Sequence, residues 1–311
     1  MPKYLITGGA GFIGSALAKS LINLGNKVRV FDNLSSGKLE NLNGVLKKID
    51  LVKGDIRDMA AVRRACIGID YVLHHAAVTS VQGSIIDPMS TSEVNILGTS
   101  NILAASKDAR VMRLVFASSA SVYGNTSKIP IKEGQSLNPI SPYAASKLAG
   151  EFYCRVFYKT FGLETVVLRY FNVFGPRQDP SSQYASVIPI FIKSLIKGNP
   201  PTIYGDGEQT RDFINVEDVV RANISAATSK NKDVVGNVFN IASGHSLSIN
   251  KMLDTANEIM GKNIAPQYAK ARTGDIKRSL ADSSKAAKIL KFKPRVPFKE
   301  GLKTTIQWYR K

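Results

Sequence analysis

The sequence predicts an α/β protein with a doubly wound, mostly parallel sheet and a smaller mixed α/β domain beside it. Short apolar segments alternate with amphipathic helical segments from residue 4 to about residue 170, which is typical of parallel strands joined by helices. The first strand runs through closely spaced glycines directly into a helix, as in the first unit of many such sheets. Beyond residue 172 prolines and glycines cluster at 175–189 and 198–207, which favours a transition to a second domain.

The individual elements follow one another in the order that such a sheet requires. An apolar strand at 4–7 leads into a helix that ends at Gly25. Asp58 is the expected N-cap of a helix at 58–67, and Gly162 ends a helix over 143–161. Further strands are expected at 28–31, 49–53, 71–74, 114–117, 165–169, 209–214 and 237–242, the last of which rejoins the main sheet. Further helices are expected at 91–107, 217–228, 249–260 and 283–290, and the segment 299–309 closes the chain.

Three glycines, Gly8, Gly11 and Gly14, lie between the first strand and the first helix. Glycines at this spacing allow a tight turn and a close backbone approach, and the free N–H groups of the helix N-terminus suit a pyrophosphate. The second strand ends at Asp32, and an acid at that distance fits a ribose 2′-hydroxyl and disfavours a 2′-phosphate. The sequence therefore predicts that the protein binds NAD rather than NADP.

The carboxyl ends of parallel strands are where such sheets bind their ligands. Five small or polar residues occupy these ends and are expected to converge on one crevice: Gly8, Asp32, Asp55, Ala76 and Ser118. His74 and His75 also follow a strand, and we expect them to line its end near the cofactor. No cluster of acids or histidines stands beside them at metal-ligand spacing, so no metal site is expected.

Tyr143 and Lys147 stand four residues apart at the start of the helix over 143–161. This spacing places both side chains on one helix face, which suits proton transfer coupled to hydride transfer. A tyrosine that acts as a base near pH 7 needs its pKa lowered by about 3 units from about 10, or roughly 4 kcal/mol. One cation about 4 Å away contributes about 4 kcal/mol at an effective dielectric near 20. Lys147, helped by an oxidised nicotinamide, is therefore expected to supply the phenolate.

Composition indicates an ordinary globular protein: 311 residues, of which 44% are hydrophobic and 21% charged. No apolar run approaches the ~18 residues of a membrane span, and the first strand follows the N-terminus too closely for a signal peptide, so we expect a cytoplasmic protein with no membrane partner. The net charge of +18 has three possible explanations: nucleic-acid binding, a polyanionic small substrate, or a lysine-rich solvated surface. The lysines are scattered, so we favour the solvated surface, with a few specific arginines binding an anionic substrate and no nucleic acid.

Several motifs together resemble those of the extended short-chain dehydrogenases/reductases, over nearly the whole chain. The motifs are Thr7-Gly8-Gly9-Ala10-Gly11-Phe12-Ile13-Gly14, His75-Ala76-Ala77, Ser118 to Gly124, Tyr143-x-x-x-Lys147, Arg169-Tyr170-Phe171-Asn172 and Tyr204-Gly205-Asp206-Gly207. Within that family the chain is most similar to the UDP-sugar 4-epimerases, and the run from Val173 to Pro180 leans toward those acting on N-acetylhexosamines. The resemblance implies an NAD-binding Rossmann domain at 1–172, which segments at about 211–243 rejoin, and a mainly substrate-binding domain at 173–311.

The resemblance also implies a role for each matching residue. Tyr143 is the catalytic base, Lys147 is its cationic partner and a ribose ligand, and Ser119 binds the sugar 4-oxygen and relays its proton. The implied cofactor site comprises Gly8, Gly11, Phe12, Ile13, Gly14, Asp32, Asn33, Ser35, Ser36, Gly37, Asp55, Ile56, Ala76, Ala77, Asn95, Tyr143, Lys147 and Phe171. The implied substrate site comprises Ser119, Tyr143, Asn172, Val187, Arg211, Arg272, Asp275 and Ser279.

The implied reaction is transient oxidation of a UDP-hexose to a 4-keto sugar, rotation of that sugar, and return of the hydride to its other face. Similar dehydratases and decarboxylases carry an extra carboxylate just before the Val-Tyr-Gly of the loop after the fifth strand. This chain has Ala120 and Ser121 there, which argues for epimerisation. Ser279 matches a site that is bulky in epimerases restricted to glucose and galactose, so we expect room for an N-acetyl group.

Two other functions remain open from the sequence. One is a UDP-uronate 4-epimerase, which would need an extra cation for the sugar carboxylate. The other is a non-catalytic dinucleotide-binding sensor, although such proteins often lack the tyrosine, lysine and serine that this chain keeps. The resemblance further implies a homodimer formed by the helices over 91–107 and 143–161, for which Phe152, Val156 and Phe157 are candidate contacts.

Overall fold

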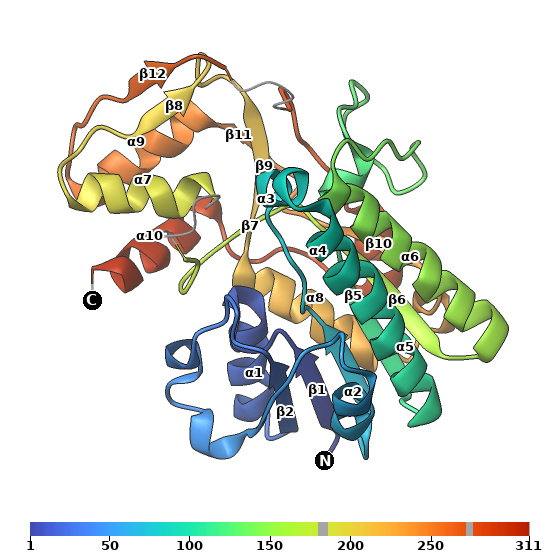
Figure 1. Cartoon of the computed structure of the whole chain (residues 1–311). Helices are drawn as coiled ribbons and strands as arrows, with labels where there is room; N and C mark the ends of the chain where they lie inside the picture. The colour runs from blue at the N-terminus through green and yellow to red at the C-terminus, as the bar shows by residue number, and fades with distance from the viewer. Residues whose placement is uncertain (180–185, 272–275, 311) are drawn as a thin grey trace.

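The structure is a computed structural model that describes residues 1–179, 186–271 and 276–310. Within these residues the main sheet has seven strands in the order β10-β6-β5-β4-β1-β2-β3, and all neighbouring pairs are parallel (Figure 1). The strands are β1 (Lys3–Thr7), β2 (Lys27–Asp32), β3 (Asp50–Lys53), β4 (Tyr71–His74), β5 (Arg113–Ser119), β6 (Glu164–Tyr170) and β10 (Val238–Ile241). The expected doubly wound, mostly parallel fold is confirmed.

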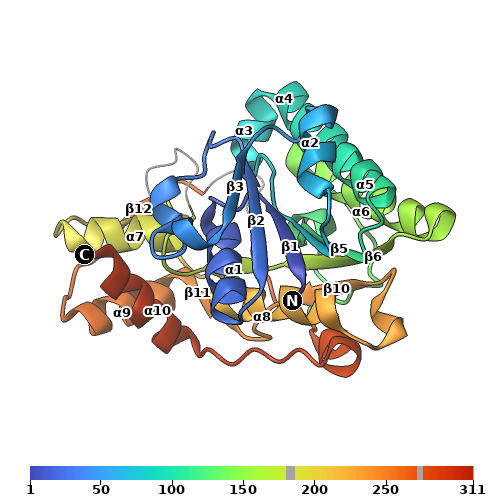
Figure 2. The same ribbon diagram turned by 90° about the horizontal axis from the view of Figure 1, so that it is seen from below.

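Helices cover both faces of this sheet (Figure 2). On one face lie α1 (Phe12–Asn23) and α8 (Val216–Thr228), and on the other lie α2 (Met59–Cys66), α5 (Gly98–Asp108) and α6 (Pro142–Phe161). Successive residues of a strand point to opposite faces, so Leu5 and Ile6 of β1 enter two different apolar cores. This double burial explains why the central strands are apolar almost throughout.

The ends of α6 are set by local sequence. The Ser141 hydroxyl accepts a hydrogen bond from the Ala144 N–H at 3.1 Å, and Pro142 occupies the first turn, where its missing N–H is not needed. Gly162 ends the helix with a left-handed φ of 73°. These caps fix the helix start, so they also fix where Tyr143 lies along the end of the sheet.

The helix expected at 91–107 is longer and less regular than its sequence pattern suggests. It consists of α4 (Pro88–Ser92), a π-helical segment η3 (Glu93–Leu97) and α5, and it follows a short helix α3 (Val81–Ile86). Gly98 lies against Ile56, where a Cβ would stand 2.5 Å from the Ile56 Cδ1. The segment expected as a helix at 283–290 is likewise π-helical over η6 (Ala286–Leu290). The spacing of hydrophobic residues does not distinguish an α-helix from a short π-helical segment, because their hydrogen bonds span four and five residues respectively.

The second part of the chain forms a smaller mixed unit with its own apolar core. It contains a three-stranded sheet, β11-β9-β7, and a two-stranded sheet, β12-β8, within the described residues. The strands are β7 (Asn172–Phe174), β8 (Thr202–Tyr204), β9 (Thr210–Asn215), β11 (Ser246–Ser248) and β12 (Gln267–Ala269), and the helices are α7 (Val187–Ile196), α9 (Ile249–Met260) and α10 (Phe298–Tyr309). The sequence analysis missed α7, because Pro189 lies in its first turn, where proline is tolerated.

The two parts are tied together through the buried carboxylate of Asp212 on β9. It accepts hydrogen bonds from the N–H groups of Ser243, Gly244 and Ala281, at 2.8, 3.1 and 3.2 Å. The strand expected at 237–242 is β10, which pairs with β6 at the edge of the main sheet, whereas β9 belongs to the smaller sheet. The domain boundary near residue 172 stays a prediction, with α8 and β10 as the later segments that pack onto the first domain.

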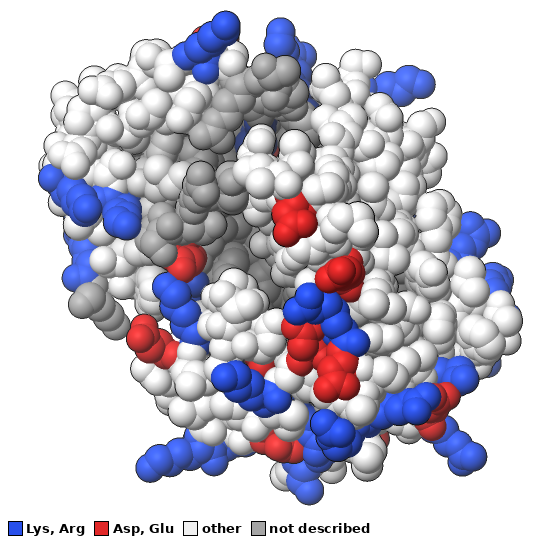
Figure 3. Space-filling model, viewed as in Figure 1, with Lys and Arg blue, Asp and Glu red and all other residues white. Residues whose placement is uncertain are grey.

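The molecular surface carries lysine and arginine side chains on many parts of the face seen in Figure 3, rather than in one continuous patch. None of the helices in the described ranges is long and apolar enough to cross a lipid bilayer. The same ranges contain no group of three His, Cys, Asp or Glu side chains that could hold a metal ion.

Candidate active site

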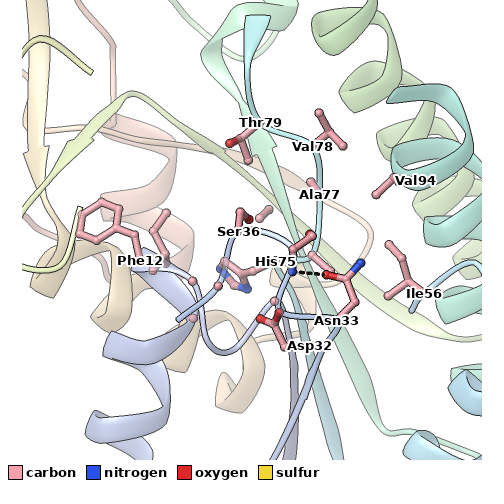
Figure 4. Close-up of a pocket in the computed structure, with 18 of the residues that line it drawn as sticks. Phe12, Asp32, Asn33, Ser36, Ile56, His75, Ala77, Val78, Thr79 and Val94 are labelled. Carbon is pink, nitrogen blue, oxygen red and sulfur yellow. Dashed lines mark hydrogen bonds between the residues drawn. The ribbon is translucent and has the colours of Figure 1, made fainter. Parts of the chain in front are cut away.

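A cavity of about 460 Å³ lies at the carboxyl ends of β1, β2, β4, β5 and β6. Its walls come from distant parts of the chain: Phe12 from α1, Asp32 and Asn33 from the end of β2, and 77–79 from the segment after β4 (Figure 4). The predicted site residues that line it are Gly8, Gly11, Phe12, Ile13, Gly14, Asp32, Asn33, Ser35, Ser36, Gly37, Asp55, Ile56, Ala76, Ala77, Ser119, Tyr143, Lys147 and Phe171.

Two glycines of this turn, Gly8 and Gly14, have no room for a side chain. Gly8 has a φ of +67°, and a Cβ there would stand 2.7 Å from the backbone nitrogen of Ala76. A Cβ at Gly14 would stand 2.2 Å from the carbonyl oxygen of Gly8. No side chain of Gly11 caps the N-terminus of α1, and its first residues Phe12, Ile13 and Gly14 line the cavity, so their N–H groups are suited to an anion there.

Asp32 lies at the base of this turn and is only 7% exposed. One carboxylate oxygen accepts the N–H of Ala10 at 2.9 Å and the other accepts the N–H of Leu34 at 2.8 Å. Each oxygen keeps a further lone pair, and the residue lines the cavity, so the carboxylate can still accept hydrogen bonds from a ribose diol.

A second carboxylate, Asp55, lines the same end of the cavity and is already paired. Arg57 and Asn33 donate to it, both at 2.9 Å, and the Arg57 hydrogen bond holds the pKa of Asp55 well below its usual range. The negative charge of Asp55 is therefore compensated by the Arg57 guanidinium, whereas the donors to Asp32 within the described residues are backbone N–H groups.

The other end of the cavity holds Ser119, Tyr143 and Lys147. Burial raises the pKa of the Tyr143 phenol, and a hydrogen bond with Ser119 acts in the opposite direction. The Lys147 ammonium donates to the carbonyl oxygen of Ala117 at 2.9 Å and lies 5.9 Å from the centre of the Tyr143 ring. Burial lowers the pKa of Lys147 to about 8.

The expectation that Lys147, helped by an oxidised nicotinamide, supplies the phenolate stays a prediction. The ammonium faces the Tyr143 ring and the Ala117 carbonyl, and desolvation of the phenol dominates, so the chain's own groups leave the pKa of Tyr143 above its usual value. Ser119, through its hydrogen bond, is the chain's own group that favours loss of the proton.

The two neighbouring histidines have different places. His75 lines the cavity, its Nε2 is 3.0 Å from the Tyr170 hydroxyl, and burial lowers its pKa to about 4, so the ring is neutral near pH 7. His74 is turned away from the cavity and bonds Thr7 and Thr99 at 2.7 and 3.0 Å. The expectation for these residues is therefore met by His75 and not by His74, because adjacent strand residues point to opposite sides.

Asn95 does not line the cavity but supports its wall. It is 2% exposed, its side chain exchanges two hydrogen bonds with the backbone of Val78 at 2.8 and 2.9 Å, and it donates to the Ser146 hydroxyl at 2.9 Å. Asn95 therefore lies behind segment 76–79, which lines the cavity, and holds that segment through the backbone of Val78.

The described members of the predicted substrate site beyond the catalytic group, which are Asn172, Val187, Arg211 and Ser279, do not line this cavity. Asn172 donates to the Asp212 carbonyl at 3.2 Å, and Arg211 donates to the carbonyls of Thr210 and Ile276. Ser279 is 7% exposed and donates its N–H to the same Thr210 carbonyl at 3.1 Å. Val187 is the first residue of α7. Arg272 and Asp275 lie outside the described residues.

Residues that the sequence analysis did not assign to the site also line the cavity. They are Phe31, Gly54, Val78, Thr79, Val94, Ala117, Tyr170, Val173 and Gln178, whereas His75 and Ser118 line the cavity as the sequence analysis expected. Most of them sit at or just after the carboxyl ends of strands, which is a signal that could have found them. Gln178 carries no such signal, because its position depends on how the chain folds back after β7.

These features fit a dinucleotide that spans the cavity from Asp32 to Tyr143. A pyrophosphate fits the uncapped start of α1 beside the glycine turn, and a ribose fits the carboxylate of Asp32. The nicotinamide end would then lie beside Ser119, Tyr143 and Lys147.

We expect the wild-type protein to bind NAD⁺ roughly 100-fold more tightly than NADP⁺, because a 2′-phosphate would meet the uncompensated charge of Asp32. Asp32→Asn should narrow this preference about tenfold or more, as measured by calorimetric titration with both dinucleotides. Asp55→Asn is the matched control and should leave the preference unchanged, since Arg57 already neutralises that carboxylate. Equal binding of the two dinucleotides by the wild-type protein would contradict the role given to Asp32.

Comparisons with known proteins agree with this geometry. Residues 4–242 match the model of the NAD dependent epimerase/dehydratase family. The UDP-glucose 4-epimerase of Mycolicibacterium smegmatis is 36% identical over 99% of this chain and 98% of its own. The structure of UDP-N-acetylglucosamine 4-epimerase from Methanobrevibacter ruminantium, in complex with UDP-N-acetylmuramic acid, is 42% identical with a TM-score of 0.95, over 99% of this chain and 98% of that one. The UDP-glucose 4-epimerase of Thermus thermophilus, a complex with NAD, is 38% identical with a TM-score of 0.91, over 99% of both chains. The chain therefore belongs to the NAD-dependent epimerase/dehydratase family, and its cofactor is NAD.

Proposed function

We propose that this protein is an NAD-dependent UDP-sugar 4-epimerase. The observation that carries the proposal is the meeting of Ser119, Tyr143 and Lys147 in the same cavity as the glycine turn and Asp32. This arrangement supports the roles of Tyr143 as proton acceptor and Ser119 as hydroxyl relay at one end of a dinucleotide site. Relatives named as UDP-glucose and UDP-N-acetylglucosamine 4-epimerases over nearly the whole chain support it.

In the proposed reaction Ser119 holds the 4-oxygen of the sugar and Tyr143 takes the proton of the 4-hydroxyl. The bound nicotinamide supplies the acceptor, and later the donor, of the C4 hydride. The 4-keto sugar then rotates so that its other face meets the nicotinamide. Return of the hydride to that face, with return of the proton from Tyr143 to the 4-oxygen, would invert the configuration at C4. Lys147, fixed on the Ala117 carbonyl, holds positive charge beside the Tyr143 ring throughout.

Epimerisation is favoured over dehydration by the residues around Ser119. The loop after β5 forms a short helix η4 (Ala120–Tyr123) whose side chains carry no carboxylate. Among the described residues that line the cavity, the carboxylates are Asp32 and Asp55, and both belong to its other end. A second acid for elimination of water is therefore missing from the described residues beside the reacting carbon.

Replacement of Tyr143 by Phe removes the proton acceptor and should lower kcat by about 10²- to 10⁴-fold. Bound NAD should be retained, because the glycine turn and Asp32 are untouched. Sugar analysis of the products from a UDP-sugar gives the rate, and release of nucleotide on denaturation gives the NAD content.

The matched control is Tyr153→Phe on the same helix, whose ring is 40% exposed, and it should keep full activity. If Tyr143→Phe epimerises at the wild-type rate, Tyr143 is not the base.

For the sugar we propose UDP-N-acetylglucosamine and UDP-N-acetylgalactosamine, with UDP-glucose and UDP-galactose as additional substrates. The support is the small side chain of Ser279, whose N–H is fixed on the first residue of β9, next to Arg211. A neighbour of 42% identity that carries an N-acetylated UDP-sugar is consistent with this choice.

Ser279→Tyr should reduce kcat/KM for UDP-N-acetylglucosamine by about 10-fold or more, while UDP-glucose changes little, because the added ring would fill the space of the N-acetyl group. Parallel assays of the two sugars give the ratio, and UDP-glucose serves as the internal control. An equal loss on both would remove the selective role of Ser279.

We further propose a homodimer in a cytoplasmic setting. Exposed apolar side chains lie on α3, α4, η3 and α6, which pack side by side (Figure 1). They are Ile85, Ile86, Met89, Leu97, Phe152 and Val156, each at least 50% exposed. A second copy of this chain would cover them, since a group of exposed apolar residues of this kind marks an interaction site. Phe157, the third candidate contact, packs against the inner core instead.

The double variant Phe152→Glu/Val156→Glu should convert a dimer into a monomer, because it places two charges in the contact. Light scattering after size exclusion gives the mass. Ile67→Glu, at a residue that is 66% exposed beyond the end of α2, should leave the mass unchanged. A wild-type monomer at micromolar concentration would refute the dimer.

A further inference from the structure

A buried ion pair lies directly beneath the end of β5. Arg169 on β6 donates to both carboxylate oxygens of Glu151 on α6, from Nε at 2.9 Å and from Nη2 at 2.6 Å. The two side chains are 3% and 6% exposed. A fully buried Arg–Glu pair adds little net stability, since desolvation offsets most of the attraction, so its geometry is the more informative property.

The pair continues a row of contacts between α6 and β5. Tyr143, Lys147 and Glu151 recur every four residues and therefore share one helix face. Along this face, Tyr143 bonds Ser119 and Lys147 donates to the Ala117 carbonyl. Glu151 accepts a hydrogen bond from the Ser118 hydroxyl. All three residues at the end of β5 are thus held by one helix, and Glu151 makes the contact next to Ser119.

Arg169 holds the loop on the far side of Ser119. It lies opposite Ser118 in the register of β5 and β6. Its Nη1 donates to the Tyr123 hydroxyl at 2.8 Å and to the Glu133 carbonyl at 3.2 Å, and Tyr123 donates in turn to Asn240 at 2.6 Å. Ser119 therefore sits between two fixed points, Ser118 through Glu151 and Tyr123 through Arg169.

We propose that Glu151 and Arg169 are positioning residues for the reaction: together they hold segment 118–123 so that the Ser119 hydroxyl meets Tyr143. This inference rests on the proposed function and adds two residues to it that do not themselves touch the substrate. The pair acts through the placement of Ser119, and a displacement of about 1 Å at such a group can cost roughly 100-fold in rate.

The test is the double variant Glu151→Leu/Arg169→Met, which replaces the pair with apolar side chains of similar length and leaves no buried charge unpaired. It should fold and keep its NAD, with kcat about 100-fold lower and KM for the UDP-sugar little changed. The matched control is Glu164→Leu/Arg113→Met, which removes an Arg–Glu pair from the opposite end of the same two strands. The control should keep the wild-type kcat.

Two further measurements separate positioning from general stability. Ser119→Ala should lower kcat far less in the Glu151→Leu/Arg169→Met background than in the wild type, because the pair acts through that hydroxyl. Amide hydrogen exchange of segment 118–124 should be faster in the double variant, with 113–116 unchanged. Glu151→Gln keeps a hydrogen-bond acceptor for Ser118 and should therefore retain more activity than Glu151→Leu. If the double variant does not fold, this comparison of single variants tests the positioning role of Glu151.

The proposal is overturned if the double variant keeps the wild-type kcat, if the effects of Ser119→Ala and of the double variant multiply independently, or if exchange in 118–124 is unchanged. Absence of epimerase activity in the wild-type protein would instead refute the proposed function. The exchange experiment would still decide whether the pair holds the loop.

Discussion

The proposed chemistry of this protein depends on the contact between one face of α6 and the carboxyl end of β5. Tyr143, Lys147 and Glu151 on that face meet Ser119, Ala117 and Ser118 respectively. Gly150 allows this approach, since a Cβ there would stand 2.4 Å from the Phe116 ring. The helix is held at its start by Ser141 and Pro142, so the cap and the glycine together decide how close the phenol comes to the strand.

The polar groups of the site are divided between the two ends of one cavity. At the Asp32 end, backbone N–H groups and a carboxylate suit the phosphates and ribose of a dinucleotide. At the Tyr143 end, the described groups are a phenol, a hydroxyl and an ammonium, with neutral His75 in the wall between them. Burial raises the pKa of Tyr143, which favours the neutral phenol, and lowers that of Lys147 to about 8, which leaves the ammonium charged near pH 7. Positive charge on an oxidised nicotinamide would favour the phenolate, so proton removal is coupled to the presence of the oxidised cofactor.

The smaller unit is joined to the main sheet by apolar packing of Val173 and Ile214 into the main core and also by polar contacts. Asp212 holds segments after β10 and near Ala281, and Arg211, next to it, bonds the carbonyl of Ile276. Of the residues expected to bind the UDP moiety, Arg211 and Asn172 lie beside these contacts, since Asn172 donates to the Asp212 carbonyl.

The sequence alone determined the alternation of strands and helices, the glycine turn, Asp32 at the end of β2 and the four-residue spacing of Tyr143 and Lys147. These features are local, because they depend on side-chain period, on glycine geometry and on the fixed pitch of a helix. Three-residue strands such as β7 and β11 were missed, since they are too short to show a period. Only the tertiary structure decided that His75 and not His74 faces the cavity, that Asn95 stands behind its wall, and that Arg169 on β6 reaches Glu151 on α6. Those outcomes depend on packing between segments far apart in the chain, where burial sets both the partner and the protonation state of each group.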